Sequence, residues 1–265
     1  MEVLKTAPEP LILRSDEDGI SSVTINRPKY YNSLTIECME AFMEELEDIA
    51  TDSSVKVVVV SGAGKGFCAG HDMRSLRANP EKSFYEKTFA ASSKLMMTII
   101  HLPKPVIAKV HGVATAAGCQ LVASCDLALA DKHARFATPG VNIGLFCSTP
   151  MVSLSRNVPR KQALEMLLTG DFISAERAYE IGLINRVVPF DELDGSVNEL
   201  ALKIASKSPL TLKIGKKAFY DQLDMNMADA YKYCAEVMVE NMMARDAEEG
   251  IDAFLEKRDP VWRGK

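Results

Sequence analysis

The pattern of apolar and polar positions divides the chain into an alternating first part and a helical second part. Continuous apolar runs at Lys56–Ser61, Val106–Val110 and Asp126–Ala130 are typical of strands buried on both faces. Helical periodicity over 35–51 and 81–101 alternates with these runs. This alternation predicts βαβ units and a parallel sheet.

Shorter elements complete the first part. The runs Leu11–Arg14 and Ser22–Asn26 flank acidic residues and a glycine at 16–19, which predicts a hairpin of two strands. Gly118–Cys125 continues apolar after a small-residue turn and predicts a short helix.

After about residue 150, helical patterns dominate, and we expect a single short strand near Arg186–Val188. The helical patterns cover 150–170, 174–182, 191–207, 209–222 and 228–257. We therefore predict an α/β core over residues 1–200 and a C-terminal helical part over 201–265.

Length and composition exclude several classes of protein. A chain of 265 residues buries about 70–75% of its unfolded surface, so it needs neither disulfides nor a metal to hold a core. With 36 acidic against 31 basic residues, it lacks the basic surplus of a nucleic-acid binder. The chain contains no run of 18 apolar residues, so the sequence predicts no membrane span.

The cysteines indicate a reducing compartment. They show no CxxC pairing, which argues against a zinc site and predicts reduced thiols. The start of the chain lacks an apolar signal core. We expect a cytoplasmic protein, although a processed mitochondrial matrix protein would look the same. The cysteines are Cys38, Cys68, Cys119, Cys125, Cys147 and Cys234.

A glycine-rich loop, Gly62–Asp72, follows the first buried run. It does not fit a phosphate cradle, because Lys65 is followed by Gly66 rather than Ser or Thr, and Phe67 stands where a dinucleotide loop needs glycine. Loops at the carboxyl ends of parallel strands bind ligands in α/β proteins. The alternative is a tight connection whose glycines adopt positive φ.

A second run of small residues, Gly112–Leu121, enters the short predicted helix. The first amides of a helix are unpaired and lie at its positive end, which suits a developing oxyanion. Close packing of helix on strand explains the same residues equally well. Taken together, the two loops would aim two backbone donors at one oxygen.

Several further stretches, spread over residues 25–258, resemble the sequence pattern of a known protein family. They are Ile25–Leu34, Cys68–Asp72, Lys104–Gly112, Ala117–Leu121, Leu168–Glu176, Ile181–Pro189 and Glu249–Arg258. In these stretches and their order, the chain resembles the enoyl-CoA hydratase/isomerase (crotonase) superfamily.

The resemblance implies a crotonase-type ββα spiral core with a C-terminal helical trimerisation part. It implies an acyl-CoA ligand, with coenzyme A as part of the substrate and no separate cofactor or metal. The thioester carbonyl would be polarised by the backbone amides of Ala69 and Ala117. The assembly implied is a homotrimer or a dimer of trimers, with no nucleic acid and no membrane as partner.

The resemblance also implies substrate contacts. Some would line the pantetheine and adenine path, and two in the C-terminal helix would reach the CoA of a neighbouring subunit. Without the resemblance, the lysines are ordinary solvated charges and Phe254 is a packing residue. The implied contacts are Lys29, Tyr31, Ala69, Gly70, His71, Asp72, Ala117, Phe254 and Lys257.

The chain departs from the family pattern at both hydratase glutamates. Gln120 stands at the first position and Gly140 at the second. A positioned general base contributes about 10²–10⁴-fold, so we expect little two-glutamate hydration. The isomerases of the family rely on the second glutamate, so Gly140 also argues against isomerase activity.

Other residues near these positions have competing interpretations. His71 has the side chain best suited to proton transfer near neutral pH, or it is a wall histidine satisfied by its own loop. We interpret Cys119 and Cys147 as small buried hydrophobes. Asp72 is expected to cap a helix that begins at Met73.

Two classes of function remain from the sequence. One is an enzyme of this family that polarises an acyl-CoA carbonyl, and the other is a non-catalytic acyl-CoA binder or scaffold on the same fold. RNA binding would need a basic helix face on 81–101, where acidic and basic residues are mixed. We therefore set RNA binding aside.

Overall fold

A computed structural model describes residues 9–265, so residues 1–8 of the predicted core lie outside the described residues. Its main sheet has six strands in the order β1-β2-β3-β4-β6-β9, and all neighbouring pairs except β1 and β2 are parallel. The strands are β1 (Ile12–Glu17), β2 (Ile20–Ile25), β3 (Val57–Gly62), β4 (Val106–Val110), β6 (Leu127–Asp131) and β9 (Arg186–Val188). The predicted α/β core and its buried parallel strands are confirmed.

A second sheet of three strands, in the order β5-β7-β8, was not predicted. It consists of β5 (Val113–Thr115), β7 (Arg135–Ala137) and β8 (Ile173–Ser174). Strands of two or three residues are too short to show alternation along the sequence. β8 also corrects the expectation that the second half of the chain contains a single strand.

Helices cover both faces of the main sheet. α1 (Ile36–Thr51) and α3 (Lys82–His101) pack together on one face, and α8 (Leu193–Ala205) packs on the other. The Thr35 hydroxyl accepts the Cys38 N–H at 3.2 Å, which satisfies one free donor of the first turn of α1. α3 ends at His101, where the helical periodicity predicted its end.

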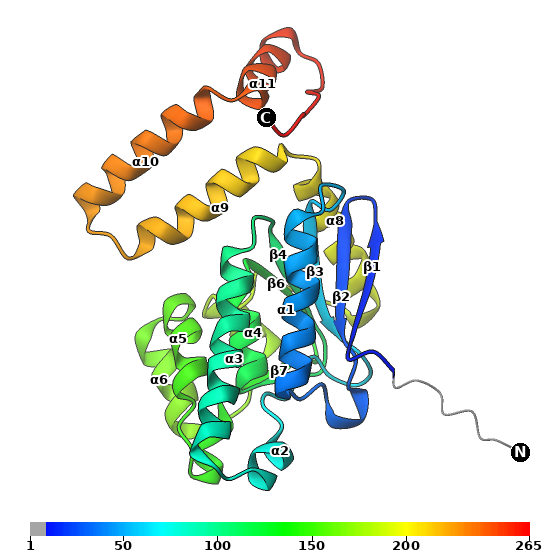
Figure 1. Ribbon diagram of the computed structural model, residues 1–265, viewed down its shortest axis with the longest axis vertical. Helices are drawn as coiled ribbons and strands as arrows, with labels where there is room; N and C mark the ends of the chain where they lie inside the picture. Colours follow the sequence, from blue (N-terminus) through cyan, green and yellow to red (C-terminus); the bar gives the residue numbers. More distant parts are fainter. Residues whose placement is uncertain (1–8) are drawn as a thin grey trace, which may run out of the picture.

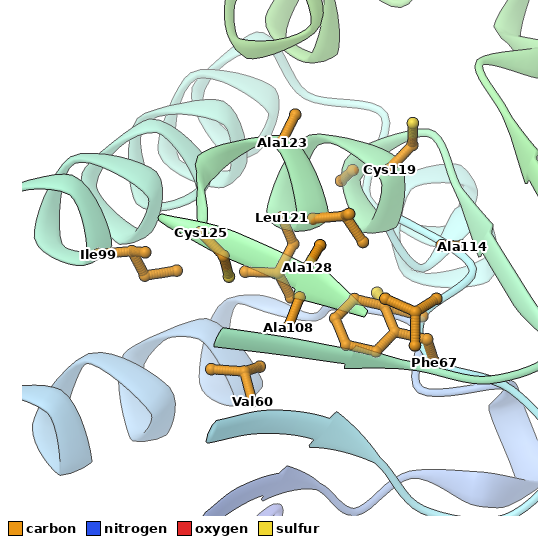
Figure 2. Packing of buried hydrophobic residues seen from close by; sticks show 14 of the residues in the cluster. Val60, Phe67, Ile99, Ala108, Ala114, Cys119, Leu121, Ala123, Cys125 and Ala128 are labelled. Carbon is orange, nitrogen blue, oxygen red and sulfur yellow. The ribbon is translucent and has the colours of Figure 1, made fainter. Parts of the chain in front are cut away.

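α4 (Ala117–Ser124) is buried at every residue. Leu121 and Cys125 point from this segment toward the strands that carry Ala108 and Ala128, while Ala123 points the opposite way (Figure 2). α4 therefore lies between the main sheet on one side and α3 and α5 (Ser148–Asn157) on the other. The helix that carries the candidate amides is fixed on all sides by packing.

The remaining core helices are short, and of these α5 packs against α4. They are α2 (Met73–Ala78), α5 (Ser148–Asn157), α6 (Arg160–Thr169) and α7 (Ala175–Glu180), together with the 3₁₀ turns η1 (Pro28–Tyr30), η2 (Pro139–Ile143) and η3 (Phe190–Glu192). The predicted helix over 150–170 is two helices, because Val158 is extended before Pro159.

The C-terminal helices α9 (Pro209–Leu223), α10 (Met227–Met242) and α11 (Arg245–Glu256) extend away from the core (Figure 1). A buried ion pair joins α9 to the core: the Lys216 ammonium lies 2.7 Å from the Asp126 carboxylate, and the Tyr220 hydroxyl donates to Asp126 at 2.9 Å. The predicted boundary after residue 200 falls inside α8, which packs as a whole on the main sheet.

The predicted helix over 228–257 is also two helices, with an extended residue at Ala244. The break lets Asp246 receive the end of the chain: its carboxylate accepts the Ser208 hydroxyl at 2.5 Å and the Arg263 and Gly264 amides at 2.8 and 3.0 Å. Among the helices of residues 9–265, none is long and apolar enough to cross a membrane.

Candidate functional site

The two loops singled out in the sequence meet at the start of α4. The Cys68 amide donates to Val113 O at 3.1 Å, and the Thr115 amide donates to Cys68 O at 3.0 Å. The Thr115 hydroxyl donates to Ala69 O at 3.1 Å. Backbone pairing therefore fixes the loop after β3 against the strand that leads into α4.

Two glycines permit this close approach. A Cβ at Gly70, which has φ +91°, would lie 2.9 Å from Ala116 Cβ and 3.1 Å from the Ala117 nitrogen. A Cβ at Gly118 would lie 2.0 Å from Cys68 O. The small residues thus serve tight packing, and the same packing brings the loop to the first amides of α4.

The backbone amides of the loop after β3 differ in whether they already donate a hydrogen bond within the protein. The Ala69 amide donates to Tyr31 O at 2.9 Å, and the Asp72 amide donates to Leu34 O at 2.9 Å. The Gly70 amide hydrogen-bonds the Cys68 thiol. Within residues 9–265, the His71 amide has no hydrogen-bond partner. The expectation that Ala69 supplies an oxyanion donor is therefore corrected, because another carbonyl already occupies its N–H.

On the other side, Ala117 is the first residue of α4, and its buried amide has no partner in the described part of the chain. The preceding residue, Ala116, has a positive φ of +50° and a ψ of −116°. The Ala116 amide donates to Ala137 O at 2.9 Å, which holds this conformation. Such a backbone costs about 1–3 kcal/mol and persists only where surrounding structure enforces it.

The positions of the two hydratase glutamates lie on α4 and η2. Gln120 is one turn after Ala117 and is 4% exposed, and its Oε1 has no hydrogen-bond partner among the residues that the structure describes. A Cβ at Gly140 would lie 2.6 Å from Leu145 O and 2.9 Å from Cys147 Sγ. With the loop in this conformation, a side chain at position 140 would clash with its backbone.

His71 lies with its ring edge-on to Phe89 of α3, with ring centroids 5.3 Å apart. Burial lowers the pKa of His71 to about 4, so the imidazole is uncharged at neutral pH. Its Nε2 is buried and has no hydrogen-bond partner within the described range, 9–265. The interpretation of a wall histidine satisfied by its own loop is therefore wrong for this nitrogen.

Asp72 caps α2 as predicted, accepting the Arg74 and Ser75 amides at 3.1 Å each. Its carboxylate also accepts Arg27 at 3.0 Å and the Ser33 hydroxyl at 3.1 Å. Burial acts to raise the pKa of Asp72, but these hydrogen bonds outweigh it and keep the pKa below its usual value. This network, which fixes the residue next to His71, could not be predicted from the sequence pattern.

Cys119 and Cys147 are both buried, as expected for small hydrophobes. Burial raises the pKa of Cys119 to about 12 and raises the pKa of Cys147 as well. A thiol that stays protonated is a poor nucleophile. No three His, Cys, Asp or Glu side chains of residues 9–265 come together as a metal site.

The substrate contacts implied by the resemblance fall into two groups. Lys29 and Tyr31 are exposed beside the loop, with Tyr31 Cδ1 3.6 Å from where a Gly66 Cβ would lie. Phe254, which is 81% exposed, and Lys257 are at the end of α11. α11 is at the opposite end of the molecule from α2, so one chain does not bring the two groups together (Figure 1).

The sequence profile of the enoyl-CoA hydratase/isomerase family matches residues 15–265. The chain belongs to this family. It is 46% identical over 245 residues to the human mitochondrial enoyl-CoA hydratase domain-containing protein 3, covering 92% of this chain and 81% of the relative. It is 34% identical over 253 residues to the short-chain-enoyl-CoA hydratase of Clostridium acetobutylicum, covering 93% and 95% of the two chains.

Solved structures agree with the fold. An enoyl-CoA hydratase from Mycobacterium smegmatis is similar with a TM-score of 0.94 and 50% identity, covering 96% of this chain and 99% of that one. Human enoyl-CoA hydratase domain-containing protein 3 gives 0.93 and 45%, covering 96% and 100%. The crotonase-type core with a C-terminal helical region is confirmed.

Proposed function

We propose that this protein binds an acyl-CoA and polarises its thioester carbonyl with the backbone amides of His71 and Ala117. The observation that carries the proposal is that both amides are unpartnered in the described residues and belong to segments that Gly70 holds in contact. His71 takes the place first predicted for Ala69. Each such donor is worth about 3–4 kcal/mol of transition-state stabilisation.

The proposed site stabilises charge without a strong base beside it. Gln120 has a neutral amide, and Gly140 has no side chain. His71 does not replace them, because a base with a pKa of about 4 accepts a proton weakly at neutral pH. Burial is the cause of that shift.

The function that follows is carbonyl polarisation of an acyl-CoA without two-glutamate hydration. A non-catalytic acyl-CoA binder or scaffold is the second candidate, favoured by the uncharged groups at both glutamate positions. The two candidates differ only in whether any thioester is converted.

Crotonyl-CoA tests the proposal. We expect calorimetry to detect binding, and we expect hydration to be at least about 10²-fold slower than with a two-glutamate hydratase measured in parallel. Hydration at the ordinary rate would contradict the proposal, and so would a lack of binding to any acyl-CoA. Binding of several thioesters without product would favour the scaffold.

We further propose that copies of the chain assemble as a homotrimer or a dimer of trimers. Lys29 and Tyr31 would then contact the CoA of their own chain, and Phe254 and Lys257 the CoA of a neighbour. The support is the exposure of Phe254 and the apolar surface of the helical part, where α10 has no buried residue.

The location of the protein has two candidates. The cysteine pattern supports the cytoplasm, whereas the names of the relatives state that they are mitochondrial. Cell fractionation with an antibody to the protein distinguishes the two.

A further inference from the structure

Asn32 is fully buried, and its side chain links the chain after β2 to the loop after β3. Its Nδ2 donates to Ala63 O at 2.9 Å and to Gly66 O at 2.7 Å, and its Oδ1 accepts the Arg27 amide at 2.9 Å. A side-chain amide has two N–H donors and a carbonyl acceptor, and all of them are paired here. A Cβ at Gly62 would lie 2.6 Å from Nδ2, so the glycine at the end of β3 leaves space for this side chain.

The backbone at Asn32 is left-handed, with φ +56°, and follows φ +49° at Tyr31. Asparagine adopts this region more readily than most residues other than glycine. After these two residues, the chain pairs with the far end of the same loop. The Leu34 amide donates to Gly70 O at 2.8 Å, and the Asp72 amide donates to Leu34 O at 2.9 Å. Asn32 therefore holds the start of the loop with its side chain and belongs to the segment, 31–34, that pairs with its end.

This pairing decides which way the His71 N–H points. Leu34 and His71 form a parallel bridge, in which Leu34 bonds the residues on either side of His71. In such a pair, the N–H of the flanked residue points away from the partner segment. The opposite side of the loop pairs with β5, which leads into α4, through a second parallel bridge between Cys68 and Ala114. The His71 N–H therefore points to the side of the loop on which α4 begins.

Resting on the proposed function, we propose that Asn32 is a positioning residue, which aims the His71 amide at the thioester carbonyl through the segment 31–34. Asn32 acts through this segment rather than by contact with the ligand, because its polar atoms already bond backbone groups. Loss of its two N–H donors would remove the anchor between the segment and the loop. The His71 N–H would then shift relative to that of Ala117, and one hydrogen bond to the carbonyl would weaken.

Two ligands measure what the carbonyl contributes to binding by the full chain. They are butyryl-CoA and S-butyl-CoA, in which a methylene replaces the carbonyl. Effects on the rest of the ligand cancel in the ratio of the two affinities. For the wild type, we expect calorimetry to show tighter binding of butyryl-CoA. Difference infrared spectroscopy with a ¹³C-labelled carbonyl should show its C=O stretch at a lower frequency than in water.

The variant Asn32→Asp keeps the size of the side chain and the acceptor for the Arg27 amide, but it lacks the two N–H donors. We expect the affinity ratio to fall about tenfold, the effect of one net hydrogen bond, and the C=O stretch to return toward its value in water. Asn157→Asp is the matched control, because Asn157 Nδ2 also donates to two backbone carbonyls, at 2.9 Å each, but at the end of α5. The control should keep the wild-type ratio and stretch.

Asn32→Gly is the second variant, because glycine adopts a positive φ without strain and introduces no buried carboxyl group. It should show the same losses, and circular dichroism checks that each variant folds. An unchanged ratio and stretch in both Asn32 variants would overturn the inference and leave the proposed function intact.

An equal loss in Asn157→Asp would also overturn the inference, since the effect would then be general destabilisation. Failure of both Asn32 variants to fold, while Asn157→Asp folds, would overturn it as well, because Asn32 would then serve folding alone. A wild-type protein that binds the two ligands equally and leaves the C=O stretch as in water would overturn the proposed function together with the inference.

Discussion

His71 has a buried imidazole and a backbone amide that no group of residues 9–265 accepts from, and only the imidazole responds to pH. The folded chain holds its pKa at about 4, against about 6.5 for an unfolded histidine. Between these values the unfolded chain takes up a proton that the folded chain does not. The free energy of unfolding therefore falls as the pH drops through this window, and the contribution of His71 is constant above it.

We expect His71→Leu to reduce this acid sensitivity. Between pH 7.5 and 5, the loss in the free energy of unfolding should be about 2 kcal/mol smaller in the variant than in the wild type. Urea unfolding at both pH values measures it. His133→Gln, which changes an exposed histidine, is the control and should keep the wild-type difference. Equal acid sensitivity in wild type and His71→Leu would mean that the imidazole titrates normally.

At the scale of elements, the decisive contact is between the loop after β3 and the N-terminus of α4. Gly118 allows α4 to lie against Cys68 O, where a Cβ would be only 2.0 Å away. The neighbour is backbone that is itself paired to Thr115, so it cannot move without breaking that pairing. The distance between the His71 and Ala117 amides therefore depends on this close approach of α4 to Cys68.

We expect Gly118→Ala to lower the free energy of unfolding by about 1–3 kcal/mol or more and to abolish acyl-CoA binding. Gly195→Ala is the matched control, because Gly195 is in α8 and a Cβ there would meet nothing within 4 Å. It should stabilise the chain by about 0.5–1 kcal/mol, through helix propensity. Normal acyl-CoA binding by Gly118→Ala would show that the contact does not set the site.

For the whole molecule, the helical part has an apolar surface that a single chain leaves uncovered. Val239 and Met243, at the end of α10, are 65% and 82% exposed. Surfaces of this kind on soluble proteins mark contacts with another chain. The ion pair between Lys216 and Asp126 fixes α9 on the core, so the surface is held in a defined position.

We expect the protein to have a mass of three or six chains of 29.1 kDa by light scattering after gel filtration. The double variant Val239→Asp and Met243→Glu should shift it toward single chains that remain folded, because both side chains are already exposed. Tyr179→Glu, a change at an exposed residue of α7, is the control and should not alter the mass. A wild-type protein that elutes as a single chain would contradict the proposed trimer.

The sequence predicted the strands and helices whose periodicity extends over several residues. β4 was predicted over its observed range, and α1 was predicted to within a residue. The breaks at Pro159 and Ala244 were missed. Ala244 has no helix-breaking residue beside it, and the contacts of Asp246 with the end of the chain are formed only in the folded protein.

The sequence alone determined the family, the two loops that meet, and the absence of carboxylates at positions 120 and 140, because these are properties of residue identity and order. Only the tertiary structure decided which amide of the first loop is free. Tyr31 O, remote along the chain, accepts the Ala69 N–H, whereas the His71 N–H has no acceptor in the described part of the chain. Every residue other than proline has the same backbone N–H and C=O groups. The hydrogen-bond partner of each group is therefore set by the fold and cannot be predicted from the side chains.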